Sequence, residues 1–151
     1  MHRLTVVAFL AAFVACAPAD QEPAADTQEA AAPAAVTLAD FAGMWTMRAM
    51  PEVGDSVLVE YQLTAAADPA GWTLTFPGRD PIPVQVTLDG DSLMMDAGPY
   101  ASVLRPDVNV STHTVARLVE GRLIGTFVAR YETTGADSVL HGRQEGTRMM
   151  H

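Results

Sequence analysis

Apolar and polar residues alternate with a period of two along most of the chain from Met44 onward. The alternation is clearest over residues 56–63, 72–76 and 82–88, and it is typical of strands with one buried face. Gly, Pro and Asp residues, which favour turns, separate these segments. The pattern predicts strands over residues 44–50, 56–63, 72–76, 82–88, 92–96, 100–104, 108–119, 123–131 and 138–148.

Eight or nine short strands joined by tight turns predict an all-β fold. The short connections indicate an antiparallel meander, in which each strand pairs with the next along the chain. An antiparallel up-and-down β-barrel is favoured, because closure removes the exposed strand edges. A β-sandwich is the alternative. A barrel of this size holds either packed side chains or one small ligand.

A short helical turn is expected just before the first strand. Thr37 is a suitable N-cap, and Asp40 places a carboxylate at the helix N-terminus three residues later. Gly43 then ends the turn, and Trp45 begins the alternating region. The folded β-barrel domain is therefore expected to comprise residues 37–151.

Gly43 and Trp45 form a Gly-x-Trp pattern at the start of the first predicted strand, and Arg148 lies at the end of the last one. This combination resembles the calycin group, which includes lipocalins, fatty-acid-binding proteins and avidins. The resemblance implies that Trp45 closes one end of the barrel and that Arg148, or alternatively Arg143, lies across its indole ring. A guanidinium over an indole face gains roughly 0.5–2 kcal/mol. The disulfide and the C-terminal helix of lipocalins have no counterpart in this sequence.

The first 36 residues differ in character from the rest of the chain. Residues 1–15 have a basic start and a short apolar run, which is typical of a signal peptide. The run ends in Phe13-Val14-Ala15-Cys16, which resembles the bacterial lipobox and implies that Cys16 is lipidated and becomes the mature N-terminus. Cleavage as an ordinary signal peptide is the alternative. Residues 16–36, rich in Ala, Pro and acidic residues, are expected to form a disordered tether.

An exported protein anchored in the cell envelope through a lipid on Cys16 is therefore expected. Acyl chains contribute roughly 0.8 kcal/mol per buried CH2, so several chains hold a protein firmly on a membrane. Ala17 follows the cysteine where many inner-membrane lipoproteins have Asp. The outer membrane, with the barrel facing the periplasm, is accordingly the expected location.

Composition narrows the range of partners. The net charge is −9, and all nine basic residues are arginines. Because phosphate backbones are bound by clustered Lys and Arg, a nucleic-acid partner is not expected. The oligomeric state is left open by the sequence.

Three motifs with possible chemistry have simpler structural explanations. Gly90-Asp91-Ser92-Leu93 matches the nucleophile motif of an esterase family, but it lies between two predicted strands, where Asp and Ser suit a turn. The methionines spaced by three over residues 44–50 match copper-binding segments, yet Met is also a common core residue. His113 and His141 would bind a metal only if their strands brought them together. No enzyme activity, cofactor or metal is expected.

The function favoured by the sequence is binding of a small apolar or amphipathic ligand inside the barrel, without catalysis. Burial of ligand surface, at about 25 cal/mol per Å², would drive binding, and it requires a cavity of roughly 300 Å3. A structural or protein-binding envelope module with a filled core is the alternative. The candidate lining is the predicted inward-facing set, namely Val57, Val59, Tyr61, Trp72, Leu74, Phe76, Phe127 and Tyr131.

Overall fold

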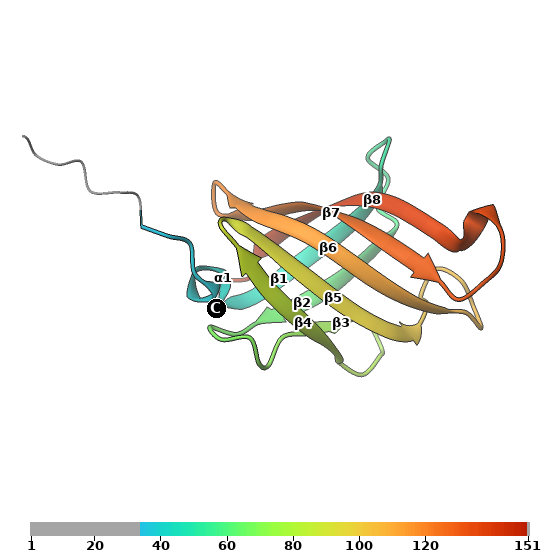
Figure 1. Cartoon of the computed structure of the whole chain (residues 1–151), viewed down its shortest axis with the longest axis horizontal. Coiled ribbons are helices and arrows are strands. Elements are labelled where there is room, and N and C mark those ends of the chain that lie inside the picture. Colours follow the sequence, from blue (N-terminus) through green and yellow to red (C-terminus); the bar gives the residue numbers. More distant parts are fainter. Residues whose placement is uncertain (1–33, 151) are drawn as a thin grey trace, which may run out of the picture. The chain divides into compact units, whose positions relative to one another are not determined.

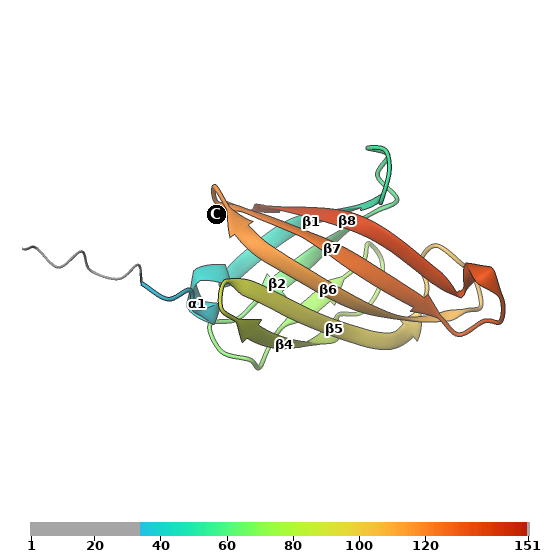
Figure 2. The same ribbon diagram turned by 45° about the horizontal axis from the view of Figure 1, so that its top comes forward.

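The computed structural model describes residues 34–150, and within them eight antiparallel strands close into a barrel (Figures 1 and 2). Each strand pairs with the next along the chain, and pairing of the first with the last completes the closure. The all-β up-and-down barrel is confirmed, and the sandwich alternative is wrong. The elements are α1 (Leu38–Phe41), β1 (Gly43–Pro51), β2 (Val59–Ala65), β3 (Thr73–Thr75), β4 (Ile82–Asp89), β5 (Ser92–Ala101), β6 (Asn109–Val119), β7 (Arg122–Tyr131), the 3-10 turn η1 (Ala136–Ser138) and β8 (Val139–Arg148).

The predicted signal peptide, Cys16 and most of the predicted tether lie outside the described residues. Within the described range, no helix is both long and apolar enough to cross a membrane. Val36, the last residue assigned to the tether, packs against the barrel core.

The structure has eight strands in the described range because the segment predicted at residues 92–96 continues into the start of the one predicted at 100–104, while residues 102–104 belong to the β5–β6 connection. β5 continues through Gly98 and Pro99 with a shift of register against β6, which is a β-bulge. A Cβ on Gly98 would lie 2.7 Å from the carbonyl oxygen of Val110. Glycine thus permits a close approach of β5 to β6 at the bulge, where the sequence suggested a break.

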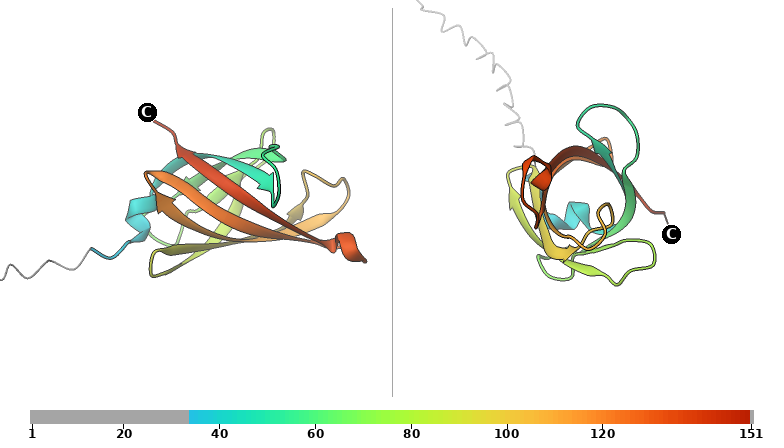
Figure 3. Two further views of the ribbon diagram at one scale, coloured as in Figure 1. Left: turned by 90° about the horizontal axis from the view of Figure 1, so that it is seen from above. Right: turned by 90° about the vertical axis from the view of Figure 1, so that its right-hand side faces the viewer.

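The barrel has a closed end and an open end. Figure 3 looks into the open end of the ring, with α1 lying across the far end. The open end carries the β1–β2, β3–β4, β5–β6 and β7–β8 connections. The strand pairing in the barrel wall is least extensive at β3, which has only three residues. The neighbouring prolines, including Pro77, Pro81 and Pro83, cannot donate a backbone hydrogen bond to an adjacent strand.

α1 forms where the sequence predicts it and closes the barrel. The carboxylate of Asp40 accepts hydrogen bonds from the backbone N–H of Thr37 at 2.7 Å and from its hydroxyl at 2.9 Å. These two bonds hold the pKa of Asp40 below its usual value. Phe41 at the end of α1 is fully buried, and its carbonyl accepts a 2.8 Å hydrogen bond from the indole N–H of Trp45.

Arg148 lies across Trp45, as the resemblance implies. The two residues are register partners on β8 and β1, and the guanidinium carbon is 4.3 Å from the centroid of the indole ring. The guanidinium also donates to the carbonyl of Ala42 and, at 2.7 Å, to that of Asp40. Arg148 therefore connects the helical turn, the first strand and the last strand.

Arg143, the second candidate for this role, lies elsewhere. Its guanidinium donates to the carbonyl of Gly54 at 2.6 Å and contacts the Asp55 carboxylate at 3.0 Å. It thus ties β8 to the β1–β2 connection at the open end.

The interior is filled most completely near the closed end. Inward-facing large side chains from all around the barrel pack there, and Trp45, Trp72, Phe41, Met47, Leu63, Leu93 and Leu123 are fully buried. This packing follows from the alternation, which places every second residue of a strand inside.

Gly43 is expected to be required at the closed end. It has φ of +134°, and a Cβ at this position would lie 3.0 Å from Nη1 of Arg148. Gly43→Ala should therefore lower the free energy of unfolding, measured by chemical denaturation, by about 1 kcal/mol more than Gly54→Ala. Gly54 is the matched control, since it also has positive φ (+99°) but has no atom within 4 Å of its Cβ position. Equal losses in the two variants would contradict the proposed contact.

Trp45→Ala should cost roughly 3–5 kcal/mol of unfolding free energy, as deletion of a buried aromatic does. Trp72 is a matched tryptophan, because it is also buried and donates its indole N–H to the carbonyl of the fourth residue before it, at 2.8 Å. A double-mutant cycle with Arg148→Met should give a coupling of about 0.5–1 kcal/mol for Trp45 and none for Trp72. Absence of coupling at Trp45 would show that Arg148 acts only through the backbone carbonyls.

Candidate functional site

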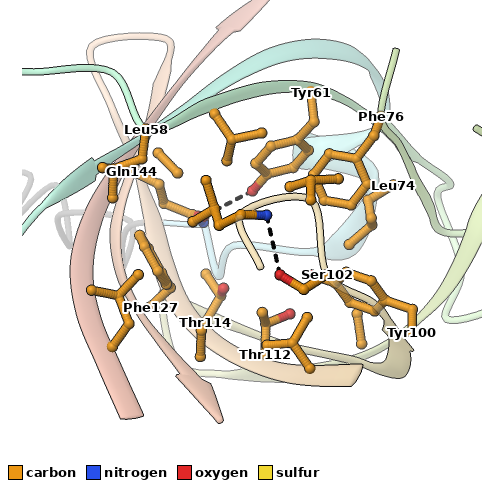
Figure 4. A pocket seen from close by; sticks show the side chains of 18 of the residues that line it. Leu58, Tyr61, Leu74, Phe76, Tyr100, Ser102, Thr112, Thr114, Phe127 and Gln144 are labelled. Carbon is orange, nitrogen blue, oxygen red and sulfur yellow. Dashed lines mark hydrogen bonds between the residues drawn. The ribbon is translucent and has the colours of Figure 1, made fainter. Parts of the chain in front are cut away.

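A mainly apolar cavity of about 70 Å3 occupies the half of the barrel next to the open end (Figure 4). Its walls come from β1, β2 and β3 on one side and from β4 to β8 on the other. The lining residues are Ala49, Leu58, Val59, Tyr61, Leu63, Leu74, Phe76, Val84, Met95, Ala97, Tyr100, Ser102, Val103, Leu104, Val110, Thr112, Thr114, Phe127, Ala129, Tyr131, Leu140 and Gln144.

The cavity exists because several inward-facing positions carry alanine. Ala49, Ala97 and Ala129 are all buried and line the space. The small side chains at these three positions leave part of the interior near the open end unfilled.

The volume limits what the cavity can hold. One water-sized group needs roughly 10–15 Å3 of such a cavity, so 70 Å3 has room for about five groups. This is well below the roughly 300 Å3 at which pockets begin to enclose whole drug-sized ligands. A short apolar group, or the end of a longer chain, fits the space.

Gln144 and Tyr61 form a buried polar pair in the cavity wall (Figure 4). The Tyr61 hydroxyl donates to Oε1 of Gln144 at 2.9 Å. Gln144 is only 2% exposed, and its Nε2 has no hydrogen-bond partner among the described residues. A buried amide donor without a partner lowers the stability of the fold by about 1–3 kcal/mol. This N–H group is therefore free to donate to an acceptor.

The cavity is electrically neutral. Within residues 34–150, the lining contains no acidic, basic or histidine side chain. Burial raises the pKa of Tyr61, and the nearby Tyr100 raises it further. Burial also raises the pKa of Tyr100, against a smaller opposing effect of its hydrogen bond with Thr112. Both phenols are therefore uncharged at physiological pH.

The connection between β5 and β6 covers part of the open end. Val103 and Leu104 contribute to the lining, and Leu104 is 40% exposed. The hydroxyl of Ser102 accepts hydrogen bonds from the backbone N–H groups of Leu104 and Arg105, at 3.1 and 3.0 Å. The guanidinium of Arg79 donates to the carbonyls of Ala101 and Ser102. These bonds hold the segment in place over the cavity.

A second guanidinium lies at the same rim. Arg105 stacks over the Tyr131 ring at 3.9 Å from the centroid and donates to the carbonyl of Asp137. The guanidinium thus lies next to Tyr131, a lining residue, but Arg105 itself does not line the cavity.

The cavity lies beside an outer groove at β3, where the strand pairing is least extensive. Tyr61 and Phe76 line both spaces, and their ring centroids are 5.5 Å apart. The groove also includes Glu60, Gln62 and the stretch Pro77-Gly78-Arg79. These two aromatic rings therefore separate the interior from the outer surface at β3.

Six of the eight residues predicted to form the lining do so, namely Val59, Tyr61, Leu74, Phe76, Phe127 and Tyr131. Val57 does not, because β2 begins only at Val59 and the Val57 side chain is 39% exposed. Trp72 is buried in the core near the closed end. Leu58, which lies between the two predicted lining residues Val57 and Val59, lines the cavity because it precedes the regular part of the strand.

Gln144 is the main lining residue that the sequence reasoning missed. His141 and Arg143, the residues of the last strand for which the sequence suggested roles inside that strand, do not line the cavity. The alternate positions Gly142, Gln144 and Gly146 are the buried ones. A glutamine between two glycines on the inward face of a strand was the available signal.

The other motifs take part in local contacts. Ser92 lies in the β4–β5 turn, where its hydroxyl is 3.2 Å from the Asp91 carboxylate and 3.0 Å from Nε of Arg117. His113 on β6 contacts the Asp96 carboxylate at 2.7 Å on the outer surface. Within residues 34–150, no group of three or more potential His, Cys, Asp or Glu ligands is placed to hold a metal ion.

Comparisons of the chain with protein-family models, with curated proteins and with solved structures find no match. The function is therefore inferred from the geometry of the cavity and from the sequence pattern of the first 36 residues.

Because the tyrosine hydroxyls are buried, we expect the free energy of unfolding to depend on pH in the alkaline range. The ordinary tyrosine pKa is 10.0, and it is raised in the folded state for Tyr61. Above pH 10 the unfolded chain loses this proton while the folded chain keeps it, so stability should fall by up to about 1.4 kcal/mol per pH unit for this group. Tyr61→Phe should reduce the slope of unfolding free energy against pH above 10, as measured by urea titrations. An unchanged slope would contradict burial of the phenol.

Proposed function

We propose that this protein is an exported, lipid-anchored, lipocalin-like barrel that binds a small apolar or amphipathic ligand without catalysis. The cavity next to the open end carries the proposal, since its lining is mainly apolar and uncharged and includes a few polar groups. Ligand sites of small barrels are typically of this kind. The lipid anchor on Cys16 and the envelope location rest on the sequence pattern of residues 1–36.

The cavity volume restricts the ligand. The space of about 70 Å3 does not meet the requirement of roughly 300 Å3 stated from the sequence, so enclosure of a whole ligand is not proposed. We therefore propose that the barrel encloses only about five non-hydrogen atoms, with any remaining part of the ligand emerging through the open end. A ceiling of about 1.5 kcal/mol per atom gives the enclosed part no more than about 7 kcal/mol, so its Kd should be micromolar or weaker.

A filled-core envelope module that binds a protein partner is the second candidate. The small size of the cavity favours it, as do apolar side chains exposed around the rim of the open end, such as Val53 (88% exposed) and Leu104. In that case the cavity would be an unoccupied packing gap. Binding of small probes to the interior separates the two candidates.

Filling the cavity should abolish binding. Purified full-length protein would be titrated with benzene and with n-alkanols from butanol to decanol, with binding followed by two-dimensional NMR. Ala97→Leu, which adds three carbons to the cavity wall, should weaken binding at least tenfold. The matched control is Ala101→Leu on the same strand, since Ala101 is exposed and absent from the lining.

Identical affinities in the two variants, or no binding by the unmodified protein, would overturn the ligand-binding proposal and favour the filled-core module. Organic extraction of the purified protein followed by mass spectrometry would identify a natural occupant. The fold of Ala97→Leu is checked independently by thermal unfolding, where cavity filling commonly stabilises a protein by about 0.5–2 kcal/mol.

A further inference from the structure

The polar pair inside the cavity indicates which chemical class of ligand the barrel selects. This inference rests on the proposed ligand-binding function and deepens it. We propose that Nε2 of Gln144 is a hydrogen-bond donor for an uncharged carbonyl-type acceptor, such as a ketone, ester or amide oxygen on a short apolar group.

The Gln144 amide is oriented with its oxygen toward Tyr61. The Tyr61 hydroxyl donates to Oε1 at 2.9 Å, which leaves the NH2 group as the free end of the amide. The side chain is 2% exposed and lines the cavity, and Nε2 has no partner among the described residues. An amide nitrogen only donates. The group it lacks is therefore an acceptor.

Ala49 leaves space next to the Gln144 amide on one side. It is the register partner of Gln144 on β1 and also lines the cavity. The partner on β7 is Gly125, where the backbone of β6 fills the space, since a Cβ there would lie 2.3 Å from the carbonyl oxygen of Val115. A ligand atom can reach the amide without displacing a large side chain.

The remaining polar groups do not define the polarity of the ligand. Ser102, Thr112, Thr114, Tyr100 and Tyr131 carry hydroxyls, which can donate or accept. The amide nitrogen of Gln144 differs from these hydroxyls, because it can only donate and has no acceptor among the described residues. The orientation of its amide therefore determines that the preferred ligand presents an oxygen acceptor.

The neutrality of the cavity excludes a charged group at this position. Transfer of an ionised carboxylate or ammonium into an apolar interior is strongly unfavourable without a partner of opposite charge, and within residues 34–150 no charged side chain lines the cavity. A fatty acid could therefore enter only with its carboxylate outside. A neutral carbonyl meets both conditions, since it accepts a hydrogen bond and carries no charge.

The test compares two probes of equal size. Pentan-2-one carries a carbonyl oxygen, and 2-methylpentane has a methyl group in its place. Each has six non-hydrogen atoms, which approximates the capacity of the cavity. Dissociation constants are measured by NMR titration of the full-length protein and of Gln144→Met, which keeps the length of the side chain but removes the donor.

The quantity to compare is the ketone-to-hydrocarbon affinity ratio, because the two probes differ in hydration. Loss of a buried hydrogen bond should reduce this ratio about tenfold in Gln144→Met. The side-chain NH2 resonances of Gln144 in the unmodified protein should shift with the ketone and much less with the hydrocarbon. An amide with a purely structural role would show no such difference between the probes.

A second variant covers the case in which Gln144→Met fails to fold. The double variant Tyr61→Phe/Gln144→Met removes both partners of the polar pair, and such paired replacements are close to neutral for stability. It should show the same reduced ratio. Gln85→Met, which makes the same substitution at an exposed position of β4 outside the lining, is the control and should keep the ratio of the unmodified protein.

The outcomes separate this inference from the proposed function. An unchanged ratio in the Gln144 variants, with both probes still bound, overturns the acceptor subsite and leaves ligand binding intact. A ratio that rises in these variants also overturns it, because the amide would then disfavour the carbonyl. Failure of both probes to bind the unmodified protein overturns the subsite and the ligand-binding proposal together.

Discussion

Closure of the barrel depends on the pairing of β1 with β8, which the contact between the guanidinium of Arg148 and the indole of Trp45 reinforces at the closed end. A closed barrel must join its first strand to its last, and these strands come from opposite ends of the folded sequence. The backbone ladder between β1 and β8 makes this junction, and Arg148 adds contacts with the ring of Trp45 and with carbonyls of Asp40 and Ala42. Gly43 provides the space for its side chain. One end of the barrel is thereby closed and rigidly packed.

A well-packed closed end allows the open end to be less completely filled. Trp45 and its neighbours bury large side chains at one end, which is where most of the hydrophobic stabilisation lies. Near the open end, Ala97 and Ala129 leave a cavity, and Gln144 leaves a buried donor without a partner. Both features cost stability. Proteins commonly carry such costs at functional sites, and this asymmetry is consistent with the proposed binding function.

The size of the cavity sets the scale of that function. A volume of about 70 Å3 suits recognition of a small group and does not suit enclosure of a large ligand. The exposed apolar side chains at the open end, such as Val53 and Leu104, are available either to the rest of a ligand or to a protein partner. Ligand binding requires an interior that small molecules can enter, whereas a filled-core module does not. Binding of small probes to the cavity therefore distinguishes the two candidate functions.

The sequence by itself determined the class of fold, most strand positions and the closed end. Periodic alternation reports directly which face of a strand is buried, so the pattern identified the inward positions of β2 and β7, including Tyr61 and Phe127. It placed the Gly43, Trp45 and Arg148 closure by resemblance. It misplaced Val57 and split β5 at Gly98, because strand ends and bulges depend on pairing with neighbouring strands.

Only the tertiary structure decided whether the interior contains space and which polar group faces it. Cavity volume depends on how side chains from eight strands pack together, so it cannot be derived from the sequence of any one strand. Gln144 acquires its role from Tyr61, which is 83 residues away in the sequence, and from the small neighbour Ala49 on the adjoining strand β1. The periodicity of one strand identifies its inward residues, but the unmet hydrogen bond arises only when the barrel closes around them.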